Sequence, residues 1–172
     1  MKIKQKVFNK ENAFLLGVSA VPINIWTIYY MLELIPAWIK SNVLWDFIGS
    51  IAYTLRYAIL DILVIFFTVI VLRLIIPDKW AKDKFLAFGF LYLAEFSTFV
   101  LLLQFVDSLF WQKRLLLIAF FGVLVFIFLM VHFIPVVNRV CQFLADRFAV
   151  LGFFFMIFNI LSILIVLIRN VF

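Results

Sequence analysis

The sequence predicts an all-α, polytopic transmembrane helix bundle of about five spans. Of its 172 residues, 68% are hydrophobic and 14% are charged, whereas an ordinary soluble domain is about half apolar and a quarter charged. The charged residues gather in short clusters between long apolar runs, so they are too few to cover a surface that faces water. Each run is about as long as the ~20 residues that a helix needs to cross a bilayer. We therefore expect one transmembrane domain over residues 1–172.

The first span is expected over 13–35. The lysine-rich start of the chain and the small residues 18–20 suggest a secretory signal, but the apolar stretch before them is too short, so we expect an uncleaved helix. Pro22 is either the first residue of the regular helix or the site of a kink. Pro36 is expected to end the helix, with an interfacial connection over 37–47.

The second and third spans flank the most polar cluster of the sequence. The second is expected over 51–76, where Pro77 stops it, and residues 78–84 form a charged loop. The third is expected over 85–106 and closes in the polar stretch that follows.

The last two spans are separated by a second polar stretch. The fourth span, over 115–134, is almost purely apolar as far as His132 and Pro135. Residues 138–147 are expected to form a short connection, and the fifth span covers 148–168. We expect no soluble domain after it. With only five glycines in the chain, tight glycine-mediated helix crossings are expected to be scarce.

The distribution of Lys and Arg predicts the orientation. The cytoplasmic side of a membrane protein carries the excess of these residues. The N-terminal side of five spans collects ten of them and the opposite side five: Lys2, Lys4, Lys6, Lys10, Arg73, Lys79, Lys82, Lys84, Arg139 and Arg147 against Lys40, Arg56, Lys113, Arg114 and Arg169. The N-terminus is therefore expected in the cytoplasm and the C-terminus outside, with the protein in a plasma-type membrane such as a bacterial inner membrane.

Glu95 is the leading candidate for a functional side chain. An ionisable group at the centre of a span costs about 2.5–3.5 kcal/mol, so it calls for a partner. Tyr92 and Thr98 flank Glu95 at three-residue spacing and form one polar stripe with it. The carboxylate either carries a proton or a cation inside the bundle, or it joins two helices or two subunits by a hydrogen bond or an ion pair.

Three further residues extend this set of candidates. Asp61 shares a helix face with Thr54 and Thr68 at seven-residue spacing, and that face is expected to point into protein. Arg56 lies on a different side of the same helix, so it either pairs with Glu33 or extends to the membrane interface. Three acids against one base leave a charge that a cation, a proton or a partner's basic side chain would balance.

Other polar residues within the spans are expected to form interhelical hydrogen bonds. These residues are Asn24, Thr27, Asn159 and Ser162.

Several chemistries are disfavoured. One cysteine and one histidine exclude an internal disulfide, a multi-thiolate metal site and bis-histidine haem ligation within one chain. No nucleotide-binding loop, nucleophile elbow or zinc-protease motif occurs. The basic residues lie beside hydrophobic spans, which favours anionic lipid headgroups over nucleic acid. The sequence therefore predicts no catalytic or metal site and leaves the cofactor open.

These observations favour a structural or accessory subunit of a larger membrane complex, with the lipid bilayer and other membrane-protein chains as partners. Small size and isolated intramembrane acids support this hypothesis. One alternative is a small transporter or channel for protons, cations or a small solute, with Glu95 and Asp61 on facing helices. Another is an intramembrane enzyme that modifies a lipid, with Asp61, Glu95 and Arg56 in its site.

Overall fold

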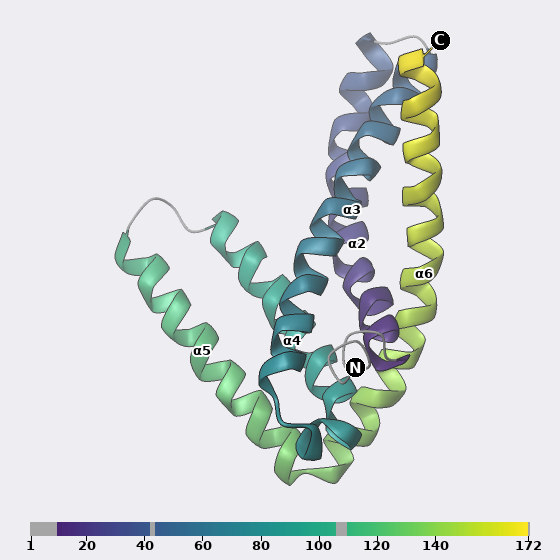
Figure 1. The fold of residues 1–172 in the computed structure, drawn as a ribbon. Coiled ribbons are helices and arrows are strands. Elements are labelled where there is room, and N and C mark those ends of the chain that lie inside the picture. The colour runs from purple at the N-terminus through teal and green to yellow at the C-terminus, as the bar shows by residue number, and fades with distance from the viewer. Residues whose placement is uncertain (1–9, 42–43, 106–109, 172) are drawn as a thin grey trace. The chain divides into compact units, whose positions relative to one another are not determined.

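The computed structural model describes residues 10–41, 44–105 and 110–171, and it is all-helical (Figure 1). The described residues form five helices: α2 (Lys10–Ser41), α3 (Leu44–Ile75), α4 (Asp78–Phe105), α5 (Phe110–Phe133) and α6 (Pro135–Val171). All five are long and apolar enough to cross a membrane, which confirms this part of the predicted fold. Lys2, Lys4, Lys6 and the polar positions 107–109 lie outside the described residues.

Helix α2 continues through both of its prolines, so the predicted end at Pro36 is wrong. The helix begins at Lys10, which makes Pro22 an interior residue rather than the first helical one. It ends at Ser41 and α3 begins at Leu44, so most of the predicted connection over 37–47 is helical. A proline removes one backbone hydrogen bond, but it does not end a helix whose other residues remain apolar and helix-compatible.

The charged residues 78–84 belong to a helix, although they were expected to form a loop. Pro77 does separate α3 from α4, as predicted, but α4 starts immediately after it at Asp78. The backbone N–H of Ile76 still donates to the carbonyl of Leu72 at 2.9 Å, so the helical hydrogen bonding of α3 extends to the residue before Pro77.

Helices α5 and α6 are separated by Ile134 alone. Residues 138–147, which were expected to form a connection, are the first turns of α6, a helix of 37 residues. Pro135 occupies its first position, where the missing N–H leaves no hydrogen bond unmade. At 1.5 Å per residue α6 is about 55 Å long, well beyond the ~30 Å thickness of a hydrocarbon core.

The described residues group into two compact units. We call residues 10–15 with 68–147 the hairpin unit, and residues 16–67 with 148–171 the three-helix unit.

In the hairpin unit, aromatic side chains join α4 to α5 along an antiparallel pair (Figure 1). The Phe96 and Phe120 rings lie 6.2 Å apart between their centroids, edge to face. Two turns nearer the start of α4, Phe88 meets Phe128 in the same way at 6.1 Å. Residues later in α4 thus contact residues earlier in α5, as expected of an antiparallel pair. Edge-to-face contacts of this kind stabilise a pair beyond the area that they bury.

In the three-helix unit, α2 and α6 run in the same direction and cross at two glycines (Figure 1). A Cβ atom added to Gly152 would overlap the carbonyl oxygen of Gly17. A Cβ on Gly17 would lie 2.7 Å from the carbonyl oxygen of Ala149. Although glycines are few, two of the five form one close backbone crossing of the kind that holds membrane helices together.

An ion pair joins α3 to the end of α6 in the same unit. The Arg169 guanidinium donates from Nη2 to a carboxylate oxygen of Asp46 at 2.6 Å. Gly49 leaves the space that this arginine fills, since a Cβ there would overlap the guanidinium. One turn further along α3, the Tyr53 hydroxyl donates to the amide oxygen of Asn170 at 2.8 Å.

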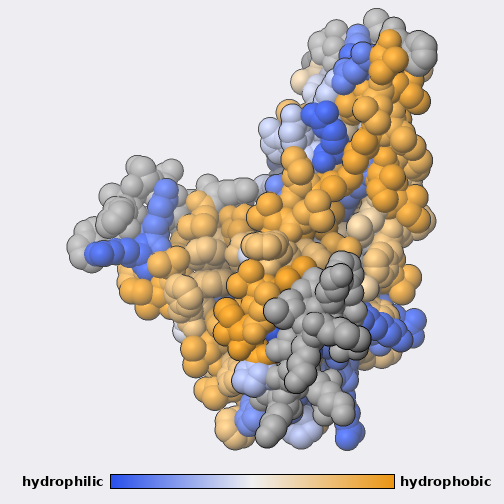
Figure 2. Space-filling view, viewed as in Figure 1, coloured by the Kyte–Doolittle hydropathy of each residue, from blue (hydrophilic) through white to orange (hydrophobic). Residues whose placement is uncertain are grey.

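Apolar residues cover much of the visible face of the molecule, and hydrophilic residues form separate groups on it (Figure 2). The exposure is greatest on α5, where only 11% of the most apolar stretch is buried, against 44% for α2. A helix that is apolar on all sides is covered by lipid or by protein.

We predict that Gly152→Ala destabilises the three-helix unit. The added methyl group must displace the α2 backbone at Gly17, and overpacking of this kind typically costs about 1–3 kcal/mol. Thermal unfolding of the purified protein in mild detergent should show a lower midpoint. Gly122→Ala on α5 is the matched control, because a Cβ there meets no atom within 4 Å. Equal midpoints for the two variants would contradict the crossing.

Candidate functional site

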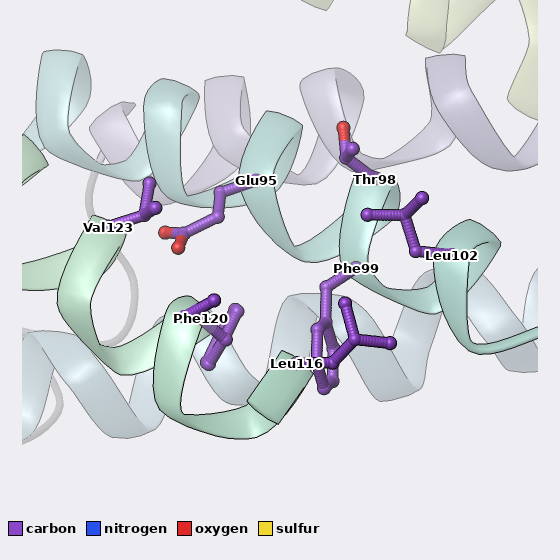
Figure 3. A pocket seen from close by; sticks show the side chains of 8 residues that line it. Glu95, Thr98, Phe99, Leu102, Leu116, Phe120 and Val123 are labelled. Carbon is purple, nitrogen blue, oxygen red and sulfur yellow. The ribbon is translucent and has the colours of Figure 1, made fainter. Parts of the chain in front are cut away.

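The side chain of Glu95 lies in a groove between α4 and α5 (Figure 3). The groove has a volume of about 250 Å³ and lies entirely within the hairpin unit. Glu95 projects from the middle of α4 toward α5. The groove is lined by Glu95, Thr98, Phe99, Leu102, Leu116, Ala119, Phe120 and Val123.

The Glu95 carboxylate is the one ionisable group in this lining. Both of its oxygens are buried, and neither accepts a hydrogen bond from the residues that the structure describes. Thr98 also lines the groove, but its hydroxyl points away from the carboxylate (Figure 3) and donates to the carbonyl of Ala94 at 2.8 Å. Burial of a polar group without a hydrogen bond costs about 1–3 kcal/mol in proteins, and a charged group costs more. The groove thus holds an acceptor without a donor.

The predicted polar stripe of Tyr92, Glu95 and Thr98 is divided between two environments. Thr98 lines the groove with Glu95. Tyr92 is buried, and its hydroxyl hydrogen-bonds with Thr68 on α3. The Tyr92 ring also packs against Phe96, with 5.8 Å between the centroids. Tyr92 therefore joins α3 to α4, and it does not contribute to the groove.

Asp61 is exposed on α3, and so is Tyr57 one turn away. Thr68, which was expected on the same face as Asp61, hydrogen-bonds with the buried Tyr92 on α4. The expectation that this face points into protein therefore stays a prediction. The buried residues of α3 include Ala58 and Ile62, each 2% exposed. Compact side chains of this kind let helices approach closely.

Arg56 is held by its own helix rather than by Glu33. Its guanidinium carbon lies 5.1 Å from the ring centroid of Tyr53 and 5.0 Å from that of Tyr57. It also donates from Nη2 to the Tyr57 hydroxyl at 3.2 Å. Stacking on aromatic faces is favourable for a guanidinium. Glu33 is exposed on α2, where the Tyr29 hydroxyl hydrogen-bonds with it.

The buried polar residues of α2 and α6 bond within their own helices, although interhelical hydrogen bonds were expected. The Asn24 amide donates to the carbonyl of Ala20 at 2.8 Å, and the Ser162 hydroxyl donates to that of Asn159 at 2.6 Å. Short side chains of this type reach the backbone of the preceding turn. The amide atoms of Asn159 are fully buried and have no hydrogen-bond partner among the described residues. Thr27 is nearly buried, at 9% exposure.

Sequence reasoning missed two features of the hairpin unit. Arg73 was counted only as an orientation signal, yet it is 6% exposed and its guanidinium lies 5.0 Å from the ring centroid of Phe85. The α5 wall of the groove was also missed, because Leu116, Phe120 and Val123 resemble every other apolar residue of that span. Their only signal is their common helix face, at spacings of three and four residues.

The chemistry available to the groove is recognition of a hydrogen-bond donor or a cation. Its lining contains one carboxylate and one hydroxyl, so it lacks the paired groups that acid–base or nucleophilic catalysis requires. Among the residues that the structure describes, no three His, Cys, Asp or Glu side chains come together as metal ligands. Comparison of the chain with models of protein families, with curated proteins and with solved structures finds no match.

We predict that Glu95→Gln raises the stability of the isolated protein by about 1 kcal/mol or more. A neutral amide is less costly to bury than a carboxylate that lacks a donor. Unfolding midpoints in detergent provide the measurement, and Asp61→Asn is the control, because Asp61 is exposed. A lower midpoint for Glu95→Gln would mean that the carboxylate has a stabilising partner within the chain.

Proposed function

We propose that this chain is a multi-pass integral membrane protein and a structural or accessory subunit of a larger membrane protein complex. Five long apolar helices support the first part of the proposal. We further propose a plasma-type membrane such as a bacterial inner membrane, with the N-terminus in the cytoplasm, because the Lys and Arg excess lies on the N-terminal side. On this assignment the polar first turns of α6 continue the helix beyond the bilayer.

The observation that carries the proposal is the Glu95 carboxylate in its groove. Both oxygens are buried without a donor among the described residues. Lipid hydrocarbon offers no donor, and an acid at membrane depth is costly unless it is protonated or paired. A second protein chain can supply the missing group. The groove lies along α5, the most exposed of the five helices, so a neighbouring helix has access to it.

The transporter and the lipid-modifying enzyme find less support. Both need more than one polar group at a shared site, either as a relay or as an acid and a base. Glu95 is the single ionisable side chain in the lining of its groove. A subunit that binds its partner through one charged contact requires a single ionisable group, and the groove contains one, the carboxylate of Glu95.

We expect partner chains to co-purify with the tagged protein in mild detergent from its native membrane. Native mass spectrometry should then give an assembly heavier than the 20.3 kDa chain and its simple multiples, with fixed stoichiometry. A tagged multi-span protein of unrelated sequence serves as the control for incidental capture. A stable monomer or a homo-oligomer with no other chain would contradict the proposal.

We also expect the two ends of the chain to be labelled from opposite sides of the membrane. In a Cys141→Ser background, Asn170→Cys should react with a membrane-impermeant maleimide from outside intact cells, and Lys10→Cys only after permeabilisation. Both side chains are exposed, so access depends on the side of the membrane. The reverse pattern would overturn the orientation.

A further inference from the structure

We propose that the Glu95 groove receives a basic side chain, Lys or Arg, from a transmembrane helix of a partner chain. The inference rests on the proposed function and specifies the contact through which the subunit binds. It identifies the occupant by charge and by size.

Charge complementarity favours a cation. The groove offers two buried carboxylate oxygens, which accept hydrogen bonds but donate none when ionised. A neutral donor would satisfy one oxygen and leave the charge in place, whereas an ammonium or guanidinium group also neutralises the charge. Hydrogen bonds between ionised partners are the stronger ones, and a guanidinium can bond both oxygens at once.

The size and the walls of the groove fit a side chain better than a free ligand. Pockets for small ligands measure about 300–1,000 Å³ and enclose most of the ligand. This groove is smaller, at about 250 Å³, and its walls come from only two helices. Phe99, Leu102 and Phe120 provide an apolar path for the methylene stem of Lys or Arg, which buries such a stem readily.

Thr98 lines the groove but does not add an acceptor beside the carboxylate. Its hydroxyl points away from the Glu95 carboxylate (Figure 3) and donates to the carbonyl of Ala94 at 2.8 Å. The two oxygens of Glu95 are therefore the acceptors that the groove offers.

Two described cations of the hairpin unit already have partners within it. Lys84 donates from Nζ to the carbonyl of His132 at 3.0 Å. Arg73 is buried against Phe85. We assign the basic group of the groove to a different protein, and displacement by a second copy of this chain is the outcome that would contradict the assignment.

A synthetic transmembrane helix tests this assignment directly. The full-length protein, labelled at Asn170→Cys in a Cys141→Ser background, is reconstituted in phosphatidylcholine vesicles. Energy transfer is measured to labelled Leu/Ala peptides that carry Arg, Leu or Glu at their centre. We expect the Arg peptide to associate roughly tenfold more tightly than the Leu peptide, since interhelical polar contacts in membranes have about that strength.

Two pairs of variants locate the contact. Glu95→Gln should reduce association of the Arg peptide to the level of the Leu peptide, while Asp61→Asn should leave it unchanged. Ala119→Trp should fill the groove and block the Arg peptide with Glu95 intact. Val125→Trp, on the opposite and exposed face of α5, should leave binding of the Arg peptide unchanged. These four results together support the assignment.

Three outcomes would overturn the inference: equal binding of the three peptides, unchanged binding of the Arg peptide by Glu95→Gln, or displacement of that peptide by unlabelled copies of this chain. If any of these occurs while partners still co-purify from the native membrane, the complex-subunit proposal stands and only the groove contact is wrong. If partners are absent but the Arg peptide binds through Glu95, the groove contact stands and the subunit proposal fails.

Discussion

The solvent that surrounds an apolar chain dictates the rest of this structure. Hydrocarbon offers no hydrogen bonds to the backbone, so each segment that crosses it must satisfy its own N–H and C=O groups, and a helix does this within one segment. Every described element is accordingly helical. On the proposal that the chain spans a membrane, the same constraint accounts for the continuation of α2 through Pro22 and Pro36, since an open loop in hydrocarbon would leave several backbone groups unsatisfied.

Hydrophobic attraction cannot select partners between helices in lipid, because lipid tails are as apolar as leucine. The two units solve this problem differently. In the three-helix unit, Gly17 and Gly152 bring two backbones into contact, and the Asp46–Arg169 ion pair fixes the far end. In the hairpin unit, stacked and edge-to-face rings set the register of α4 and α5. One region uses the smallest side chains and the other uses some of the largest.

The sequence predicted the number and character of the helices because hydropathy accumulates over some twenty residues. Prediction of the helix ends from the sequence was much less accurate. Polar residues such as Asp78 and Arg139 are compatible with helix as well as with loop, and tertiary context decides between the two. Position along a span identified Glu95, whereas helical spacing alone did not reveal that Asp61 is exposed. Periodicity finds a polar face, but which face is buried depends on neighbours that lie far away in the sequence.

The single residue between α5 and α6 makes chain length itself a structural determinant. With only Ile134 to absorb a change, one inserted residue would rotate the start of α6 by about 100° and advance it by about 1.5 Å. The side chains in the first turns of α6 would then point in a new direction relative to α5. At this connection the fold tolerates substitution far better than insertion or deletion. We therefore expect natural variants to differ in residue identity there and to keep the same length.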